Sequence, residues 1–428
     1  MRRLIKIWPL AFILAGGMSI EAEGRDFGGG LSVGSDYTDN ARKSAVQPQI
    51  SERQDRLQLD VFANHENEYG KLDSLYTGAY NSFSESSQID RNTLAGSGRL
   101  LLGKTYQPLN LLLSHTRRLL LNAPNEVALL SNTDEQTVTS VNPTARFRVT
   151  PVDSLVASAD HSVVDYRFAQ RQNSVRDTVS LQWEHSISKT DSLQVLAQQT
   201  NVTYEAFNNA QYTYRLGSAT YATRLNRLDY SLNLGYNTTQ SDLSGDNASP
   251  SYSVGANYRL DSGTMALKLN RVITDTSMGS NTGGVSIPLG TASVSQGFDQ
   301  IDQRSALLSW SAAAICGRCT LELSGSLSES NYLTLPVITN EQTLRAAFGY
   351  TLSRTSSIRL DGQAQSVRYT IGASEQGYSG YTYNIAYNEQ FRHNISASLT
   401  ARFEQRSSEQ ALYDYDAMQV GFSLRYQY

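Results

Sequence analysis

The chain ends with Met418-Gln419-Val420-Gly421-Phe422-Ser423-Leu424-Arg425-Tyr426-Gln427-Tyr428. Every even-numbered position in this stretch is apolar or aromatic, and every odd-numbered position is polar or glycine. Successive side chains of a β-strand point to opposite faces, so the pattern predicts a strand with one apolar face and one wet face.

The same alternation recurs along most of the chain. From Ile395 to Arg406, for example, alternate residues from Ile395 to Phe403 are apolar and those between them are polar. Each apolar face runs over about ten positions, the length that a tilted strand needs to cross a bilayer, and no later segment approaches the roughly 18 apolar residues of a membrane-spanning helix. We therefore predict an all-β fold: a single closed antiparallel transmembrane β-barrel of about 18–20 strands over residues 23–428.

The strand number is least certain near the N-terminus. About 17 strands follow Leu94, and three more candidates precede it, at Gly28–Tyr37, Arg56–Tyr69 and Leu75–Phe83. The segment Ser44–Glu52 could form another strand, which would change the pairing there. An even number is expected when both ends of the chain lie in the periplasm.

Short and long connections alternate along the chain. Short turns are predicted at Lys104-Thr105-Tyr106, Pro151-Val152-Asp153, Ser188-Lys189-Thr190, Leu225-Asn226-Arg227, Asp261-Ser262-Gly263, Gly317-Arg318, Arg354-Thr355 and Arg392-His393. Long polar connections are predicted at Asn122–Gln136, Ser241–Pro250, Thr274–Gln303, Leu333–Glu341, Gly372–Ser379 and Ser407–Asp414. Outer-membrane barrels have short periplasmic turns and long outer loops. The longest connection, Thr274–Gln303, is either a disordered outer loop or a constriction folded into the lumen.

Composition and the N-terminus agree with a bacterial outer-membrane location. Apolar residues make up 39% of the chain, mean hydropathy is −0.39, and there are 25 Tyr. A water-filled barrel needs this mixture, with tyrosines at the two membrane interfaces. Residues 1–22 predict a secretory signal peptide, because three basic residues precede a short apolar core. The net charge of −4, without a basic block, argues against nucleic-acid binding.

Aromatic residues predict where the chain meets the membrane. Trp183 and Trp310 each lie a few positions before a short turn, which favours the periplasmic interface. The final strand, with Phe422, Leu424, Tyr426 and Tyr428, resembles the C-terminal signal read by the barrel-assembly machinery. The expected partners are therefore that machinery and outer-membrane lipid.

The opposite strand faces are expected to line the lumen. The residues chosen as lumen-lining are Arg99, Arg146, Arg148, Arg259, Arg345, Arg359, Arg402, Glu404 and Arg425. Acidic residues on the same faces nearly balance the basic ones, whereas a channel dedicated to polyanions would show a stronger basic excess. The pattern favours either a cross-strand lattice of ion pairs or a polar path for a hydrated, weakly charged solute.

Cys316-Gly-Arg-Cys319 falls at a predicted short turn. A redox Cys-x-x-Cys usually opens a helix, and here both flanks have strand character. Neither a second cysteine pair nor a histidine lies nearby to complete a zinc site. A Cys316–Cys319 disulfide across a periplasmic hairpin is the favoured interpretation.

Catalysis has little support in the sequence. Ser114 and His115 are adjacent, as are Asp160 and His161, and adjacent strand residues point to opposite faces. Neither pair can act as a local dyad, so we predict no catalytic, cofactor-binding or metal-binding residues.

Two short stretches carry a resemblance to a known family. Val33-Gly-Ser-Asp-Tyr-Thr-Asp-Asn40 opens the predicted mature chain, and Arg91-Asn-Thr-Leu-Ala-Gly-Ser-Gly-Arg-Leu100 leads into a leucine-rich strand. With the overall layout, they resemble the outer-membrane β-barrel family found with exosortase/PEP-CTERM exopolysaccharide systems. The resemblance implies a role in surface polysaccharide or protein sorting, with polysaccharide-export components as partners, and it carries over no catalytic residues.

Three functions remain open from the sequence. The first is a passive channel or export conduit, for exopolysaccharide if the resemblance holds. The second is a plugged barrel that scaffolds periplasmic or surface partners, and the third is an outer-membrane enzyme.

Overall fold

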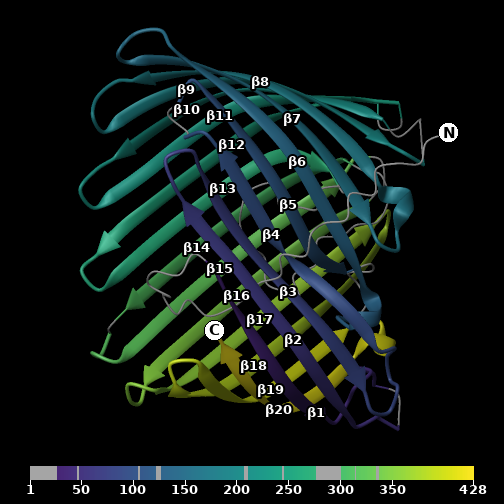
Figure 1. The fold of residues 1–428 in the computed structure, drawn as a ribbon. Coiled ribbons are helices and arrows are strands. Elements are labelled where there is room, and N and C mark those ends of the chain that lie inside the picture. Colours follow the sequence, from purple (N-terminus) through teal and green to yellow (C-terminus); the bar gives the residue numbers. More distant parts are fainter. Residues whose placement is uncertain are drawn as a thin grey trace, which may run out of the picture.

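The chain folds into a closed barrel of twenty antiparallel strands (Figure 1). The computed structural model describes residues 27–428 apart from 46–47, 105–106, 122–126, 207–210, 243–244, 276–299, 314 and 334–336. The predicted signal peptide lies outside these described residues. The strands are β1 (Phe27–Thr38), β2 (Glu52–Glu66), β3 (Gly70–Phe83), β4 (Arg91–Leu102), β5 (Leu109–Leu121), β6 (Thr133–Arg148), β7 (Asp153–Tyr166), β8 (Ser174–Ser186), β9 (Asp191–Tyr204), β10 (Tyr212–Arg224), β11 (Leu228–Ser241), β12 (Gly245–Leu260), β13 (Gly263–Asp275), β14 (Gln300–Ala313), β15 (Cys319–Tyr332), β16 (Val337–Thr351), β17 (Ser356–Ile371), β18 (Ser374–Arg392), β19 (Ile395–Ser408) and β20 (Tyr415–Gln427).

Pairing of the first and last strands closes the sheet. Each strand pairs with its neighbours in the chain, and β1 also pairs with β20 from Gly30↔Gln427 to Thr38↔Gln419. Every ladder is antiparallel, so no crossover connection is needed. The predicted fold class is therefore confirmed. Within the described part of residues 39–51 there is no strand, so the alternative of a strand at Ser44–Glu52 is wrong.

The two ends of the barrel differ in their connections. At one end, which we call the turn end, residues 67–69, 103–108, 149–152, 187–190, 225–227, 261–262, 314–318, 352–355 and 393–394 join consecutive strands. The opposite end, with residues 39–51, 84–90, 167–173 and 409–414 among its connections, we call the loop end. The turn end is at the left of Figure 1. Seven of the eight predicted short turns, and Lys104 of the eighth, lie at the turn end, which by the rule for such barrels faces the periplasm. Thr105 and Tyr106 lie outside the described residues.

Several predicted long connections are shorter than expected. Strand β6 already begins at Thr133, β12 at Gly245, β16 at Val337 and β18 at Ser374. Most of these segments are polar on both faces and therefore resemble loops in sequence, although β16 begins with Val337 and Ile338. Strand pairing uses backbone groups, however, so the ladders continue beyond the apolar band. The predicted loop Thr274–Gln303 is bounded by strands that reach Asp275 and resume at Gln300, and residues 276–299 lie outside the described part.

An apolar band covers the outside of the barrel. Large apolar side chains with about half of their surface exposed recur on one face of successive strands, among them Leu234, Leu344 and Phe422. In water such a surface would be unfavourable, whereas in lipid it is the expected exterior. Trp183 lies on this face near the turn end, and Trp310 shares it because Trp310 pairs with Met265 and Leu323. No helix among the described residues is long and apolar enough to span a membrane.

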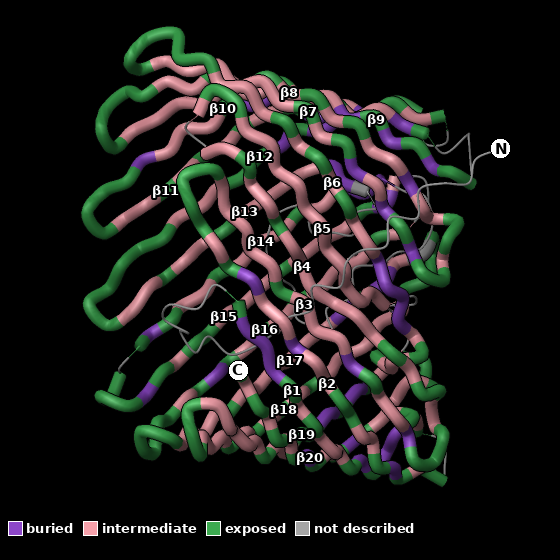
Figure 2. The backbone as a smooth tube through the Cα atoms, in the orientation of Figure 1, coloured by how far each residue is buried: buried purple, intermediate pink, exposed green. Residues whose placement is uncertain are grey.

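Buried residues gather toward the loop end (Figure 2). Many of them, such as Val164, Val202 and Tyr369, lie on strand faces opposite to the apolar band. The inside of the barrel is therefore more densely packed in its loop half than in its turn half.

Candidate functional site

The candidate site is the inner wall of the barrel. Register along each ladder assigns every residue to one of two faces, because residues paired across strands share a face. This assignment places all nine predicted lumen-lining residues on the face opposite to the exposed apolar side chains. They are Arg99, Arg146, Arg148, Arg259, Arg345, Arg359, Arg402, Glu404 and Arg425.

Opposite charges on this wall form a cross-strand lattice. Arg359 Nη2 lies 3.1 Å from Glu322 Oε2, and its Nε lies 3.1 Å from Asp361 Oδ1. Arg345 Nη2 is 3.6 Å from the same Asp361 oxygen. On other strands Arg146 pairs with Glu184, and Arg259 Nη2 lies 2.8 Å from Asp229 Oδ2. Most lumen charges are thus neutralised by an adjacent partner.

Glu404 is the centre of a second group of ion pairs, and one of its partners comes from a loop. Arg402 pairs with Glu404 from the same strand, and Nζ of Lys43 lies 2.5 Å from its Oε2. Lys43 belongs to the connection 39–51, which is fastened to β20 by a hydrogen bond from Asn40 Nδ2 to the carbonyl of Asp416 (3.0 Å). The alternation that identified the strand residues carries no information on this loop, so Lys43 was missed in the sequence.

A third ion pair crosses the closing strand. Arg425 Nη2 on β20 lies 3.1 Å from Asp60 Oδ2 on β2, and β1 lies between them. Asp60 is fully buried. A Cβ at Gly30 on β1 would lie only 3.2 Å from Arg425 Nε, so glycine leaves room for the pair to pass over the strand.

Two of the predicted arginines have no ion-pair partner among the described residues. Arg99 and Arg148 are both exposed on the inner face, and Arg148 donates a long hydrogen bond to the carbonyl of Pro151 (3.5 Å). Their charges are therefore exposed on the inner face.

A small buried group of side chains lies on the inner wall near the loop end. Val202 and Tyr204 of β9 are paired on the inner face with Tyr212 of β10 and Ser174 of β8, and all four are buried. Inner-face residues of a wide aqueous bore would keep part of their surface in water. The inner surface of the barrel at the level of these four residues is therefore closely packed and not open to water. The tyrosines were expected at the membrane interfaces, and only the register shows that these two point inward.

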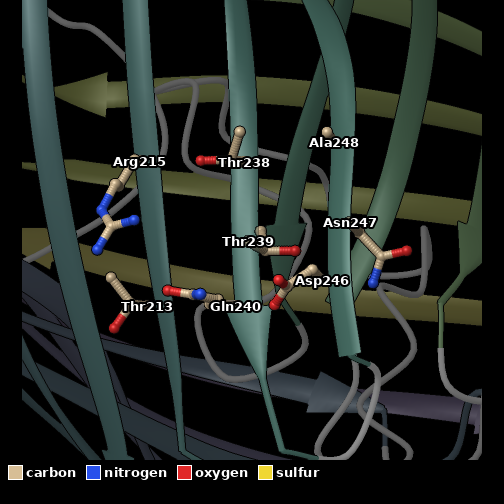
Figure 3. A pocket seen from close by; sticks show the side chains of 8 residues that line it. All are labelled: Thr213, Arg215, Thr238, Thr239, Gln240, Asp246, Asn247 and Ala248. Carbon is tan, nitrogen blue, oxygen red and sulfur yellow. The ribbon is translucent and has the colours of Figure 1, made fainter.

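A polar hollow lies beside the loop end on β10, β11 and β12 (Figure 3). Its volume is about 280 Å³, and it is lined by Thr213, Arg215, Thr238, Thr239, Gln240, Asp246, Asn247 and Ala248. Thr213, Arg215 and Asp246 lie on the outward face by register, beyond the apolar band. The hollow is therefore part of the polar collar of the barrel rather than of the bore.

The histidines do not form dyads with their sequence neighbours. His115 and His161 lie on the outward face, whereas Ser114 and Asp160 lie on the inner face, as predicted. His115 Nδ1 is hydrogen-bonded to the Tyr76 hydroxyl (2.5 Å), and His161 Nδ1 lies 2.7 Å from Asp177 Oδ1. Within the described part of the chain, no cluster of His, Cys, Asp and Glu could hold a metal ion.

Cys316 and Cys319 form a disulfide in the turn between β14 and β15. Their Cα atoms are 5.1 Å apart, within the usual range for a disulfide. The predicted pairing and its place at the turn end are confirmed.

Replacing both cysteines with serine should leave the barrel able to assemble. The disulfide closes a very short loop, so its contribution to the free energy of unfolding is at most about 2 kcal/mol in the chain-entropy model. Heat-modifiable gel mobility of Cys316→Ser/Cys319→Ser measures the folded fraction. A folded fraction reduced to less than half of wild type would show that the disulfide is needed for assembly.

Comparison with solved structures gives the same architecture. The chain is similar to the siderophore receptor PirA of Acinetobacter baumannii, with a TM-score of 0.50, 11% identity, and coverage of 94% of this chain and 81% of that one. It is also similar to the FrpB iron transporter of Neisseria meningitidis (TM-score 0.47, 9% identity, 95% and 82% covered) and to OccK2 of Pseudomonas aeruginosa (0.43, 13%, 94% and 98%). No family model and no curated protein sequence matches. The likeness to PirA is one of fold, and together with the apolar band it identifies a bacterial outer-membrane barrel.

Proposed function

We propose that this barrel is a passive conduit across the outer membrane for hydrated solutes of little net charge, and for surface polysaccharide in particular. The observation that carries the proposal is the inner wall, where most charges are paired with opposite charges at 2.5–3.6 Å. A wall of this kind offers hydrogen bonds along its length without a strong net field. A dedicated anion pore would instead present a ring of unpaired basic side chains.

The resemblance to barrels of exosortase/PEP-CTERM systems supports polysaccharide as the solute. A polysaccharide is rich in hydroxyl groups, which exchange hydrogen bonds readily with serine, threonine and paired charged side chains. Polysaccharide-export components in the periplasm would then meet the turn end, which the short connections leave accessible.

The test is conductance of the purified barrel in planar lipid bilayers. We expect ohmic steps with a K⁺/Cl⁻ permeability ratio near one, and efflux of small neutral dextrans from loaded vesicles. Conductance strongly selective for anions would contradict the proposed solute class. Conductance without dextran efflux would restrict the conduit to small ions.

Ion selectivity should respond to the free lumen charges. Arg99→Glu reverses an exposed inner charge, so it should raise the K⁺/Cl⁻ ratio by about twofold or more through the local field. Arg53→Glu is the matched control, because Arg53 lies on the outward face of β2 beside Asp55. If Arg99→Glu and Arg53→Glu gave the same K⁺/Cl⁻ permeability ratio, Arg99 would not line the conducting path.

A plugged scaffold is the second candidate, favoured by the buried inner group Val202, Tyr204 and Tyr212. Such packing across the whole bore would block conduction. Folded barrels that give neither conductance nor efflux would favour this function over the conduit.

A further inference from the structure

The polar hollow on β10, β11 and β12 opens on the outside of the barrel (Figure 3). Arg215 pairs with Thr238, and Gln240 pairs with Asp246, so these four residues share one face of the sheet. It is also the face of Tyr236, which belongs to the apolar band and is 55% exposed. The outward residues of the lining are Thr213, Arg215, Thr238, Gln240, Asp246 and Ala248, whereas Thr239 and Asn247 belong to the inner face.

The hollow lies just beyond the apolar band. Along β11 every outward residue from Leu228 to Tyr236 is apolar or aromatic, over about the 9–11 residues that a tilted crossing needs. From Gln199 on β9, Arg215 on β10 and Thr238 on β11 to the loop-end termini of these strands, all outward residues are polar. This is the level of the lipid headgroups. Because the loop end faces outward, they belong to the outer leaflet.

Two opposite charges lie on different sides of the hollow. Arg215 is on β10 and Asp246 on β12, with β11 between them. Two strand spacings separate their Cα atoms by about 10 Å or more. Both side chains are exposed, and within the described residues neither has an ion-pair partner. The hollow therefore presents a positive and a negative group that no described side chain neutralises.

Neighbouring polar side chains hold the positive side of the hollow in place. Arg215 Nε donates a hydrogen bond to Gln199 Oε1 on β9 (3.0 Å), and Thr213 Oγ1 donates to Asn201 Oδ1 (3.1 Å). The bond to Gln199 uses Nε and leaves the two Nη groups of the guanidinium available to a ligand. Figure 3 shows Gln240 between Arg215 and the negative side of the hollow.

We propose that this hollow binds the headgroup of an outer-leaflet lipid that carries both a phosphate and a primary amine, such as a phosphoethanolamine group. The phosphate accepts hydrogen bonds from Arg215, because guanidinium groups recognise phosphate through charge-assisted pairs. The ammonium group donates to Asp246, and Gln240 contributes its amide between the two. A headgroup with a phosphate alone would leave Asp246 unpaired. The site does not depend on conduction through the bore.

The test is titration of the purified barrel in neutral detergent, read by native mass spectrometry. One probe is phosphatidylethanolamine, and the other is phosphatidylglycerol with the same acyl chains, which has the phosphate but no amine. We expect phosphatidylethanolamine to bind about tenfold more tightly, because only its headgroup satisfies both charges of the hollow.

Two single substitutions separate the two charges. Arg215→Gln should weaken binding of both lipids about tenfold, since both carry the phosphate. Asp246→Asn should weaken binding of phosphatidylethanolamine alone and thereby remove the preference between the lipids. A purely structural role for Asp246 would not change one affinity without the other. Both side chains are exposed, so the variants should fold, and heat-modifiable mobility checks this.

The matched control is Arg304→Gln. Arg304 also lies on the outward face beyond the apolar band, on β14, but its Nη1 is 3.2 Å from Glu329 Oε1 and it is not part of the hollow. The affinities of this variant for both lipids should stay within about twofold of wild type.

Three results would overturn the proposal. One is equal affinity of the wild-type barrel for the two lipids, and another is an unchanged lipid preference in Asp246→Asn. The third is competition by soluble glycerophosphoethanolamine at the same concentration as the lipid, which would make the hollow a site for a free zwitterion.

Discussion

Phe422→Arg should abolish assembly of the barrel, whereas Ser423→Arg should leave it largely intact. Phe422 lies midway along the outward face of β20 and is 51% exposed, between Leu399 of β19 and Ser35 of β1. An arginine there would face the bilayer interior, at a cost of about 2–4 kcal/mol. Ser423 is its sequence neighbour on the inner face, where a guanidinium group keeps its water.

The pair is a sharp test because both variants add the same charge to the same strand. Heat-modifiable mobility of barrels folded into lipid vesicles gives the assembled fraction. Phe422 also belongs to the predicted insertion signal, with Leu424, Tyr426 and Tyr428, so assembly in cells should fall further than folding in vesicles. Equal assembly of the two variants would refute the assignment of faces.

Asp60→Asn should lower the free energy of unfolding by about 3 kcal/mol. Asp60 is fully buried, and its charge is balanced by Arg425 across the closing strand β1. Removing the carboxylate charge leaves a partly buried guanidinium group without a counter-charge. The loss falls where β1 and β20 close the barrel, so the closing ladder should be the first to separate.

Asp229→Asn is the matched control for this prediction. Asp229 also pairs with a lumen arginine, Arg259, at 2.8 Å, but more than half of the Arg259 side chain is exposed. Water can therefore solvate the freed arginine, and the expected loss is below about 1 kcal/mol. Denaturant unfolding in lipid vesicles measures both values. A similar loss of unfolding free energy in Asp60→Asn and Asp229→Asn would mean that burial of the Asp60–Arg425 pair across β1 adds nothing to stability.

Much of the fold could be predicted because the strands obey one simple rule. In a barrel wall, one face contacts lipid and the other water, so each strand shows its two faces directly as alternating residues. The inner positions of Arg345 and Arg402 follow from this alternation alone. The Cys316–Cys319 disulfide could be predicted because a short turn brings two nearby residues together.

The rest depends on contacts that the alternation does not encode. Lys43 reaches Glu404 from a loop, and Arg167 reaches Glu135 from another. Strand ends were misplaced where polar residues occupy both faces, because backbone pairing continues without an apolar face. The inward position of Tyr204 follows from the register at the end of β9, where the sequence pattern of apolar and polar residues is no longer informative.

The length of the strands also fixes the shape of the mouth. Strands β17 and β18 have 16 and 19 residues, against the roughly 9–11 that a tilted crossing needs. With the usual tilt, six surplus residues raise the wall at these two strands by about 15 Å above the lipid. One side of the mouth is thus an upright ledge of hydrogen-bonded backbone. A protease or antibody that acts on its crest would trim or cover this ledge without changing the width of the barrel.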